Sequence, residues 1–172
     1  LVKLFVITKK QYNLLIRFEQ LICEGNKKIN LVSRKDINNF KINHIAHSLS
    51  ISFYFKFKNG TENLDLGTGG GLPGIPLDII FPNVNFHLID KVGKKIDVVT
   101  NIVRNLKLRN VKTNWINVKK INNRYDFVIS RSVSSYDTIL KNCESIFLSE
   151  NQNEFENGFI LFKGGDLRNE FK

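Results

Sequence analysis

Apolar residues recur every three or four positions in two segments of residues 1–60, a spacing typical of helices that bury one face. The clearest pattern spans residues 8–25, with Thr8 as the expected N-cap and Gly25 as the expected end. Its buried face is predicted to hold Tyr12, Leu15, Ile16, Phe18, Leu21 and Ile22. A second, interrupted pattern spans 36–57, with Ile37, Phe40, Ile45, Leu49 and Phe53 on one side. We therefore expect residues 1–60 to form a helical N-terminal extension.

After Gly60 the rhythm changes to short apolar runs that alternate with helical segments. Strands are predicted at 63–66, 85–90, 110–115, 126–130 and 158–162. Helices are predicted between them at 76–81, 94–106 and 136–148. This alternation favours a parallel sheet covered by helices on both faces. Residues 61–172 are therefore predicted to form one α/β domain with a doubly wound, mostly parallel, Rossmann-like sheet.

A glycine-rich segment at 65–76 joins the first predicted strand to the first helix of this domain. It reads Asp-Leu-Gly-Thr-Gly-Gly-Gly-Leu-Pro-Gly-Ile-Pro, with five glycines in eight residues. Glycine lets the chain turn tightly and lets a ligand approach the backbone, at an entropic cost that a plain turn does not require. Gly69, Gly71 and Gly74 also satisfy the dinucleotide pattern G-x-G-x-x-G, and Asp90 follows near the distance of a ribose-binding carboxylate. The segment therefore predicts a ligand loop.

The charges around this loop favour S-adenosylmethionine (SAM) as the ligand. Residues 61–90 hold four acids and no Lys or Arg, which suits the cationic groups of SAM. Asp65 stands two residues before the first glycine, where a carboxylate suits a cation better than a pyrophosphate. A nucleoside triphosphate is disfavoured because no Lys-Ser or Lys-Thr follows the loop. Asp90 would bind the ribose of SAM or of NAD equally well, so an NAD-dependent oxidoreductase is the alternative enzyme class. Asp90 could also be a helix N-cap without any ligand.

The net charge of +10 is concentrated in two blocks of the sequence. Residues 1–60 hold eleven Lys and Arg against three acids, and residues 91–131 hold eleven against two. Such blocks favour a phosphate-rich partner such as RNA, whereas any single lysine is as well explained by solubility. No apolar run has the length of a membrane span, no targeting segment is recognisable, and Cys23 and Cys143 lack metal-ligand spacing. We therefore expect a cytoplasmic protein with reduced cysteines.

Several segments spread over the chain occur together, and in the same order, in one known family. They are residues 30–36, His44 with 47–49, 65–76, Asp90 with Lys94 and Lys95, 130–133, and Lys163 with Gly164. In these segments the chain resembles the bacterial 16S ribosomal RNA (guanine-N7) methyltransferases, also called the glucose-inhibited division protein B family. The resemblance implies a sheet of the SAM-dependent methyltransferase type. It also implies a hairpin after the fifth strand, which we do not expect in this sequence.

The resemblance implies SAM contacts at Gly67, Leu72, Val118, Lys119 and Arg131. With the loop and strand residues added, the expected cofactor site comprises Asp65, Gly67, Gly69, Gly71, Leu72, Asp90, Val118, Lys119 and Arg131. Two positions depart from the family's pattern. The chain reads Asn117-Val118-Lys119 where Arg-Ala-Glu or Arg-Val-Glu is usual, so the acid expected near the adenine is absent. His47 stands where Asp is common.

The activity implied by the resemblance is methyl transfer from SAM to N7 of a guanine in the 530 loop of 16S ribosomal RNA. N7 has a free lone pair, so no general base is required, and Arg131 is expected to orient the cofactor or the base. The expected partner is 16S ribosomal RNA or the small ribosomal subunit, bound by a monomeric enzyme. A protein of this fold that binds RNA without catalysis is the non-enzymatic alternative.

Basic and histidine side chains complete the predicted site. Lys94, Lys95 and Lys163 are predicted to contact RNA phosphates. His44 and His47 stand three apart on a predicted helix, a spacing that metal ligands share with packed or capping histidines. Packing and capping are the commoner roles, so no metal is assigned to this pair.

Overall fold

The computed structural model describes residues 5–33, 35–131 and 136–164. Helix α1 spans Lys9–Asn26 and confirms the first predicted helix. Thr8 caps it, because the Thr8 hydroxyl accepts the Gln11 backbone N–H at 3.2 Å and the Gln11 side chain accepts the Thr8 backbone N–H at 2.8 Å. Two backbone donors at the start of the helix are thereby satisfied.

Gly25 does not end α1, contrary to the prediction from the sequence. It lies inside the helix, and a Cβ atom at this position would lie 2.7 Å from Val98 Cγ1 and 3.0 Å from Leu31 Cδ1. Val98 belongs to helix α4 (Gly93–Leu106), which packs against α1. Gly25 therefore allows two helices to approach closely, a role that depends on the tertiary fold.

Four short helical segments follow α1 and lead toward the sheet. They are η1 (Ile37–Asn39), η2 (Lys41–Ala46), α2 (His47–Leu49) and η3 (Ser50–Phe53). Together they confirm the interrupted helix, although the helical segments end at Phe53, four residues before the predicted end, and Phe53 itself is exposed. Segment η2 is a π-helix, a wider turn that occurs in short pieces and often at functional sites.

The sheet has five described strands, all parallel, in the order β3-β2-β1-β4-β5. Their bounds are β1 (Glu62–Leu66), β2 (Asn85–Asp90), β3 (Val111–Trp115), β4 (Phe127–Arg131) and β5 (Gly158–Phe162). The ranges of β2 and β5 agree with the predicted ones, and each other strand differs by one residue at one or both ends. The chain moves outward from β1 to β3, then returns to the other side of β1 for β4 and β5. The doubly wound parallel sheet is therefore confirmed.

Helices α3 (Gly74–Ile80), α4 and α5 (Tyr136–Cys143) alternate with the strands. The sequence predicted that the last of these helices reaches residue 148, but α5 ends five residues earlier. The Tyr125 backbone N–H donates to the Ile146 carbonyl at 2.9 Å, and the Leu148 N–H donates to the Tyr125 carbonyl at 2.9 Å. The chain after α5 therefore pairs like a strand and cannot stay helical.

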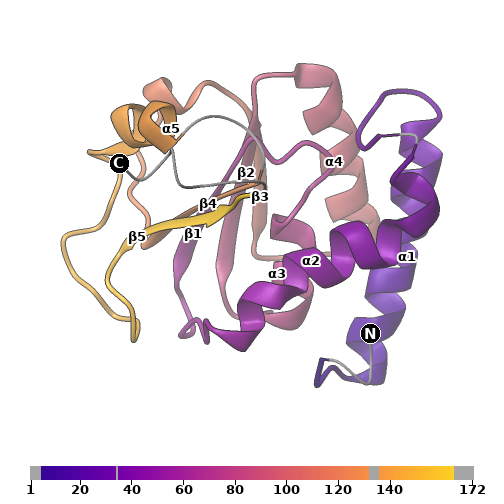
Figure 1. The fold of residues 1–172 in the computed structure, drawn as a ribbon, viewed down its shortest axis with the longest axis horizontal. Coiled ribbons are helices and arrows are strands. Elements are labelled where there is room, and N and C mark those ends of the chain that lie inside the picture. The colour runs from indigo at the N-terminus through magenta and orange to yellow at the C-terminus, as the bar shows by residue number, and fades with distance from the viewer. Residues whose placement is uncertain (1–4, 34, 132–135, 165–172) are drawn as a thin grey trace.

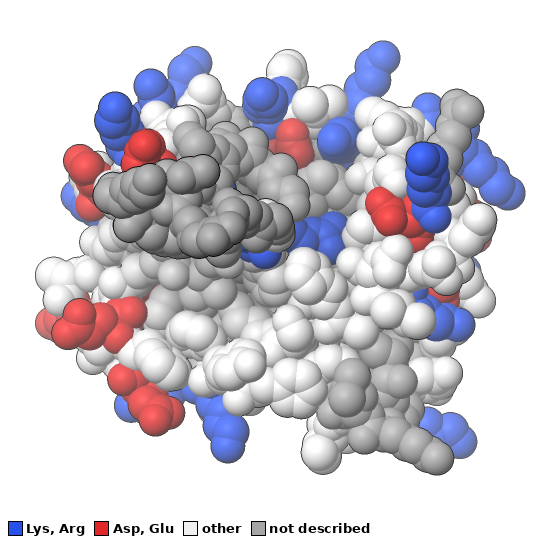
Figure 2. All heavy atoms as spheres, viewed as in Figure 1, with Lys and Arg blue, Asp and Glu red and all other residues white. Residues whose placement is uncertain are grey.

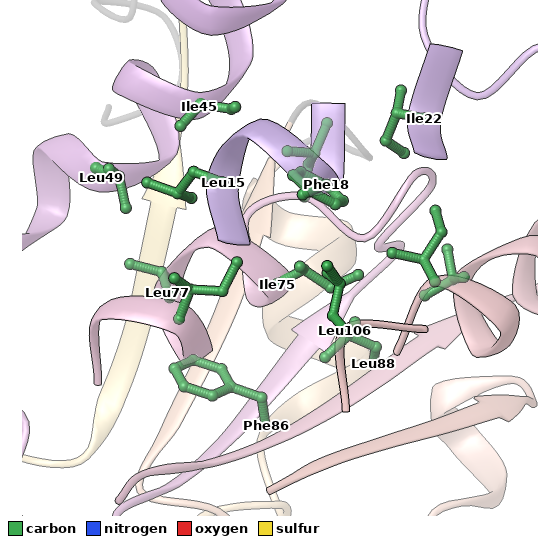
Figure 3. Packing of buried hydrophobic residues seen from close by; sticks show 14 of the residues in the cluster. Leu15, Phe18, Ile22, Ile45, Leu49, Ile75, Leu77, Phe86, Leu88 and Leu106 are labelled. Atoms are coloured by element: carbon green, nitrogen blue, oxygen red, sulfur yellow. The ribbon is translucent and has the colours of Figure 1, made fainter. Parts of the chain in front are cut away.

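Two hydrophobic cores lie on opposite faces of the sheet. On one face, Phe86 and Leu88 of β2 pack with residues of α1, α2, α3 and α4, as Figure 3 shows. On the other face, Leu64 and Val128 pack against Ile139 of α5, which Figure 1 shows well apart from α1. The N-terminal helices and the sheet thus share one core, and the predicted division at residue 60 stays a prediction.

Among the described residues, no helix combines the length and the hydrophobicity that crossing a membrane requires.

Candidate functional site

Strands β1 and β4 lie side by side in the sheet. The chain continues from β1 to β2 on one side and from β4 to β5 on the other, so the strand order reverses between β1 and β4. Open α/β sheets bind ligands at the carboxyl ends of the strands beside such a point. A cavity of about 640 Å³ lies there, within the size range of small-molecule sites. Both its location and its volume therefore suit a cofactor.

The wall of the cavity has two parts. One part comes from the ends of the first three strands and the loops that follow them: residues 66–70, Leu72, 89–92, Lys95 and 116–118. The other part comes from the chain between α1 and α2, from β4 and from α5: Leu31, Asp36, Asn43, His44, His47, Arg131, Thr138, Ile139 and Asn142. The glycine loop and Arg131 thus share one cavity, as the sequence predicted.

Asp65 is fully buried beneath the glycine loop and is not among the described residues that line the cavity. Its Oδ2 accepts the Thr68 hydroxyl at 2.7 Å and the Gly74 backbone N–H at 2.9 Å. Burial raises the pKa of Asp65 to about 6, against the opposing effect of these two hydrogen bonds. The structure places this carboxylate under the loop, so we expect it to act on a cofactor through the shape of the loop.

The glycines of the loop have two different roles. Gly67, Gly69 and Gly71 all have positive φ, at 72°, 58° and 83°, which favours glycine. A Cβ atom on Gly71 would lie 2.5 Å from Ile75 Cδ1, so this glycine makes room for the start of α3. A Cβ atom on Gly69 would have no described atom closer than 3.9 Å, although Gly69 lines the cavity. At Gly69 the described atoms thus leave room beside the cavity wall, and we expect a side chain there to compete with a ligand.

Asp90 is the last residue of β2 and lies in the cavity wall. Its Oδ1 accepts the Val92 backbone N–H at 2.9 Å, and its Oδ2 accepts the Gly69 backbone N–H at 3.0 Å. The N-cap of α4 is Val92, so the simple helix-cap alternative for Asp90 is wrong. Each carboxylate oxygen has a second lone pair, so Asp90 keeps the capacity to accept hydroxyl groups of a ligand.

Arg131 and two histidines make the basic part of the wall. Arg131 lies at the carboxyl end of β4, and burial lowers its pKa, against the attraction of Asp65 and Asp36. Burial and the Arg131 charge lower the pKa of His44 to about 4, and both also lower the pKa of His47. Both ring nitrogens of His44 are buried without a hydrogen-bond partner in the described part of the chain. The cavity therefore presents one cation and two neutral imidazoles on this side.

The predicted residues are only partly brought together. Gly67, Gly69, Leu72, Asp90, Val118 and Arg131 line the cavity. Lys119 is exposed in η4 (Val118–Lys120) and is not among the described lining residues, although its neighbours Asn117 and Val118 are. Of the predicted RNA contacts, Lys95 lines the cavity, whereas Lys94 and Lys163 are not in its described wall.

The pocket is not free of lysine, contrary to the expectation drawn from residues 61–90. Lys91 and Lys95 line it from the segment that follows Asp90. The lysine-free range ends with β2 at Asp90, whereas the cavity wall continues through residues 91 and 92 and into α4 at Lys95.

Sequence reasoning missed the polar residues that the N-terminal segments contribute. Asp36 and Asn43 both line the cavity and are joined by a hydrogen bond from Asn43 Nδ2 to Asp36 Oδ1 at 3.2 Å. Hydrogen bonds from Ser33 and Asn43 lower the pKa of Asp36. Asn43 and His44 belong to the π-helix η2. The signal in the sequence was the segment 30–36, which carried the family resemblance without an assigned role.

Comparison with known proteins identifies the family of the chain. Residues 11–172 match the protein family described as GidB, rRNA small subunit methyltransferase G. The ribosomal RNA small subunit methyltransferase G of Porphyromonas gingivalis is 44% identical over 158 residues, which cover 90% of this chain and 72% of that protein. The chain belongs to this family. Membership confirms the family predicted from the sequence and decides against both the oxidoreductase and the non-catalytic alternatives.

Solved structures with low sequence identity share the fold. A crystal structure of coclaurine N-methyltransferase bound to N-methylheliamine and SAH has a TM-score of 0.54 and 16% identity, covering 60% of this chain and 32% of that one. The precorrin-6y C5,15-methyltransferase of Geobacter metallireducens has a TM-score of 0.53 and 14% identity, covering 77% of this chain and 64% of that one. The methyltransferase type of the sheet is therefore confirmed.

Proposed function

We propose that this member of the family transfers the methyl group of SAM to N7 of a guanine in the 530 loop of 16S ribosomal RNA. The observation that carries the proposal is the cavity in which the glycine loop, Asp90 and Arg131 meet at the carboxyl ends of the strands. The small ribosomal subunit or its RNA is the substrate. We propose that the enzyme acts as a monomer in the cytoplasm, where this RNA is assembled.

The cavity residues fit SAM. The loop leaves open space at Gly69, where any side chain would extend into the cavity. Asp90 offers lone pairs at the end of β2, where a ribose is expected. Ile89, Ile116 and Val118 supply apolar wall near this carboxylate, which suits an adenine ring. The volume of about 640 Å³ also leaves room for a nucleobase beside the cofactor.

The chemistry requires positioning more than proton transfer. When bound, SAM supplies an electrophilic methyl group on a sulfonium. Guanine N7 already has its lone pair free, so no residue has to remove a proton before attack. The chain's task is to hold the two partners in line and to keep water out of the space between them.

Arg131 and the histidines suit this task. Arg131 is the cation at the strand end on the β4 side of the wall, and we expect it to orient the cofactor carboxylate or the guanine without covering N7. His44 and His47 are held neutral by burial and by Arg131. Neutral rings add no positive charge where methylation makes the base cationic.

A basic rim accompanies the cavity. Figure 2 shows Lys and Arg side chains gathered along the upper edge of the molecule, on the side where Figure 1 shows α4 and α5. Lys94 and Lys95 stand in the first turn of α4, directly after the segment that forms the wall. This placement supports phosphate contacts beside the methyl-transfer site.

The proposal is tested by methyl transfer from tritium-labelled SAM to small subunits and to free 16S ribosomal RNA from cells that lack the endogenous enzyme. We expect incorporation, with 7-methylguanosine as the labelled nucleoside in mass spectrometry. Subunits from cells with the enzyme present serve as the control, because their target is already methylated. Label in another nucleoside, or equal label in both kinds of subunit, would contradict the assigned target.

A further inference from the structure

We propose that Trp115 is a stacking platform for an unpaired base of the RNA substrate, beside the mouth of the cavity. The inference rests on the proposed function for the identity of the partner, a single-stranded RNA segment. Trp115 is the last residue of β3, at the edge of the described sheet. It is outside the predicted site and outside the described wall of the cavity, although Ile116 and Lys91 belong to that wall.

The indole ring is held at both its edge and its face. Trp115 Nε1 donates to the Lys91 carbonyl at 3.0 Å, which satisfies the one polar atom of the ring. A Cβ atom built on Gly93 would lie 3.1 Å from Cδ2 and 3.3 Å from both Cε2 and Cε3. Such nearly equal distances to three joined ring atoms place Gly93 under the flat face of the indole. The absence of a side chain at Gly93 thus lets the ring lie flat on the start of α4.

Away from the face that lies on Gly93, most of the indole is open to solvent. Trp115 is 71% exposed, although its ring is large, apolar and fixed in orientation. Exposing such a surface is unfavourable, and a fixed ring forgoes the rotamer freedom that would partly compensate. An exposed but oriented aromatic face is what proteins use to stack unpaired bases.

The charge of the adjoining segment favours a nucleic acid as the partner. The segment on which the ring lies is rich in lysine: Lys91, whose carbonyl accepts from the ring, and Lys94 and Lys95, which directly follow Gly93. Single-stranded nucleic acid is bound by this combination of aromatic faces for bases and cations for phosphates. An apolar protein partner would not require three lysines in this segment.

The chain offers a direct probe, because Trp115 is its one tryptophan. Its intrinsic fluorescence therefore reports on this position alone. We expect quenching when a single-stranded oligoribonucleotide with the sequence of the target loop is added to the protein. The same oligonucleotide annealed to its complement should quench far less, because its bases are already stacked. S-adenosylhomocysteine alone should leave the emission nearly unchanged.

Substitutions test whether RNA binding depends on the aromatic face of Trp115. Trp115→Ala should weaken binding of the oligoribonucleotide roughly tenfold or more, and Trp115→Phe, which keeps an aromatic face, should restore most of it. In the methylation assay Trp115→Ala should raise the KM for RNA and leave kcat at saturating RNA unchanged. Tyr54→Ala is the matched control, because Tyr54 is 75% exposed in a different part of the fold, after η3, and should change neither quantity.

The outcomes separate this inference from the proposed function. Unchanged RNA affinity in Trp115→Ala, or no quenching by the single strand, would overturn the platform even if methylation proceeds. Quenching by S-adenosylhomocysteine together with weaker cofactor binding in Trp115→Ala would reassign the residue to the cofactor site. RNA binding that depends on Trp115 without any methylation would preserve the platform and refute the proposed reaction. Thermal melts and the Trp115→Phe variant show whether an effect arises from misfolding.

Discussion

The backbone N–H of Gly69 donates a hydrogen bond to Asp90 Oδ2 at 3.0 Å, and this bond ties the glycine loop to the end of β2. The second oxygen of the same carboxylate holds the Val92 N–H, at the start of α4. One side chain thus fixes two segments of the cavity wall while lone pairs remain for a ligand. The preformed shape of the cofactor site depends on this pair.

Gly69→Val is expected to abolish SAM binding, with a loss of roughly 100-fold or more, because the branched side chain would extend into the cavity. Titration calorimetry with SAM and S-adenosylhomocysteine measures the loss, and NAD should bind neither the wild type nor the variant. Gly60→Val is the control. Gly60 has a similar positive φ, 81°, and no atom within 4 Å of a built Cβ, so it introduces backbone strain without blocking the cavity. Equal loss of affinity in both variants would show that strain, not occlusion, is the cause.

The sequence allowed the sheet to be predicted because each strand is a short apolar run bounded by turn residues. In β2, for example, Phe86, Leu88 and Ile89 are buried, and the observed range agrees with the prediction. Local patterns of this kind do not depend on distant partners. The positions that failed do depend on them: Gly25 packs against Val98 of another helix, and the end of α5 is set by the pairing with Tyr125.

The candidate site was predicted where a motif is contiguous and missed where the fold assembles it. Gly67, Gly69 and Asp90 follow directly from the loop and the strand end. Asp65 is adjacent to the loop in sequence, but the pleat of the strand decides whether its carboxylate points into the core or into the cavity. The distance from Asp65 to the first glycine did not reveal which of the two directions applies. Asn43 reaches the cavity through a π-helical turn that no residue pattern predicts.

Replacing both Lys94 and Lys95 with Ala should weaken RNA binding, with little change in SAM affinity. The slope of the logarithm of RNA affinity against the logarithm of salt concentration should fall by about 1 for each phosphate that is no longer neutralised. The measurement is RNA binding over a series of salt concentrations, with SAM affinity measured in parallel. The matched control is Lys9→Ala with Lys10→Ala, because these two exposed lysines also occupy the first turn of a helix, α1. Similar slopes in both double variants would mean that Lys94 and Lys95 are only a solvated helix surface.

Asp78→Asn should stabilise the protein at mildly basic pH. Asp78 lies in α3 with 4% exposure, its Oδ1 has no hydrogen-bond partner among the described residues, and burial raises its pKa to about 7. The folded state then holds the proton more tightly than the unfolded state, so the free energy of unfolding falls as pH rises from about 4 through about 7.

Asparagine cannot ionise, so the Asp78→Asn variant should lack this decline and exceed the wild type by about 1–3 kcal/mol near pH 8. Urea unfolding at a series of pH values gives the difference between the two proteins. Asp97→Asn, at an exposed acid on α4, should show no such divergence with pH. A difference that is constant across the range would attribute the effect to packing instead of ionisation.

The rate of methyl transfer should depend little on pH between about 7 and 8, because guanine N7 requires no deprotonation and the pKa values of the nearby histidines are lowered. The pKa of His44 lies at about 4 and that of His47 is lowered from its ordinary value, whereas Asp65, beneath the glycine loop, has a pKa of about 6 and titrates mainly below this range. Single-turnover rates at saturating SAM and RNA, with the product nucleoside identified at each pH, measure the profile. We further expect that no single substitution of Asp65, Asp90, His44 or His47 abolishes transfer while both SAM and RNA still bind, since these residues shape the site and exchange no proton with the reacting atoms. A bell-shaped profile, or a variant with both ligands bound and no transfer, would reveal an acid or base and contradict transfer by positioning alone.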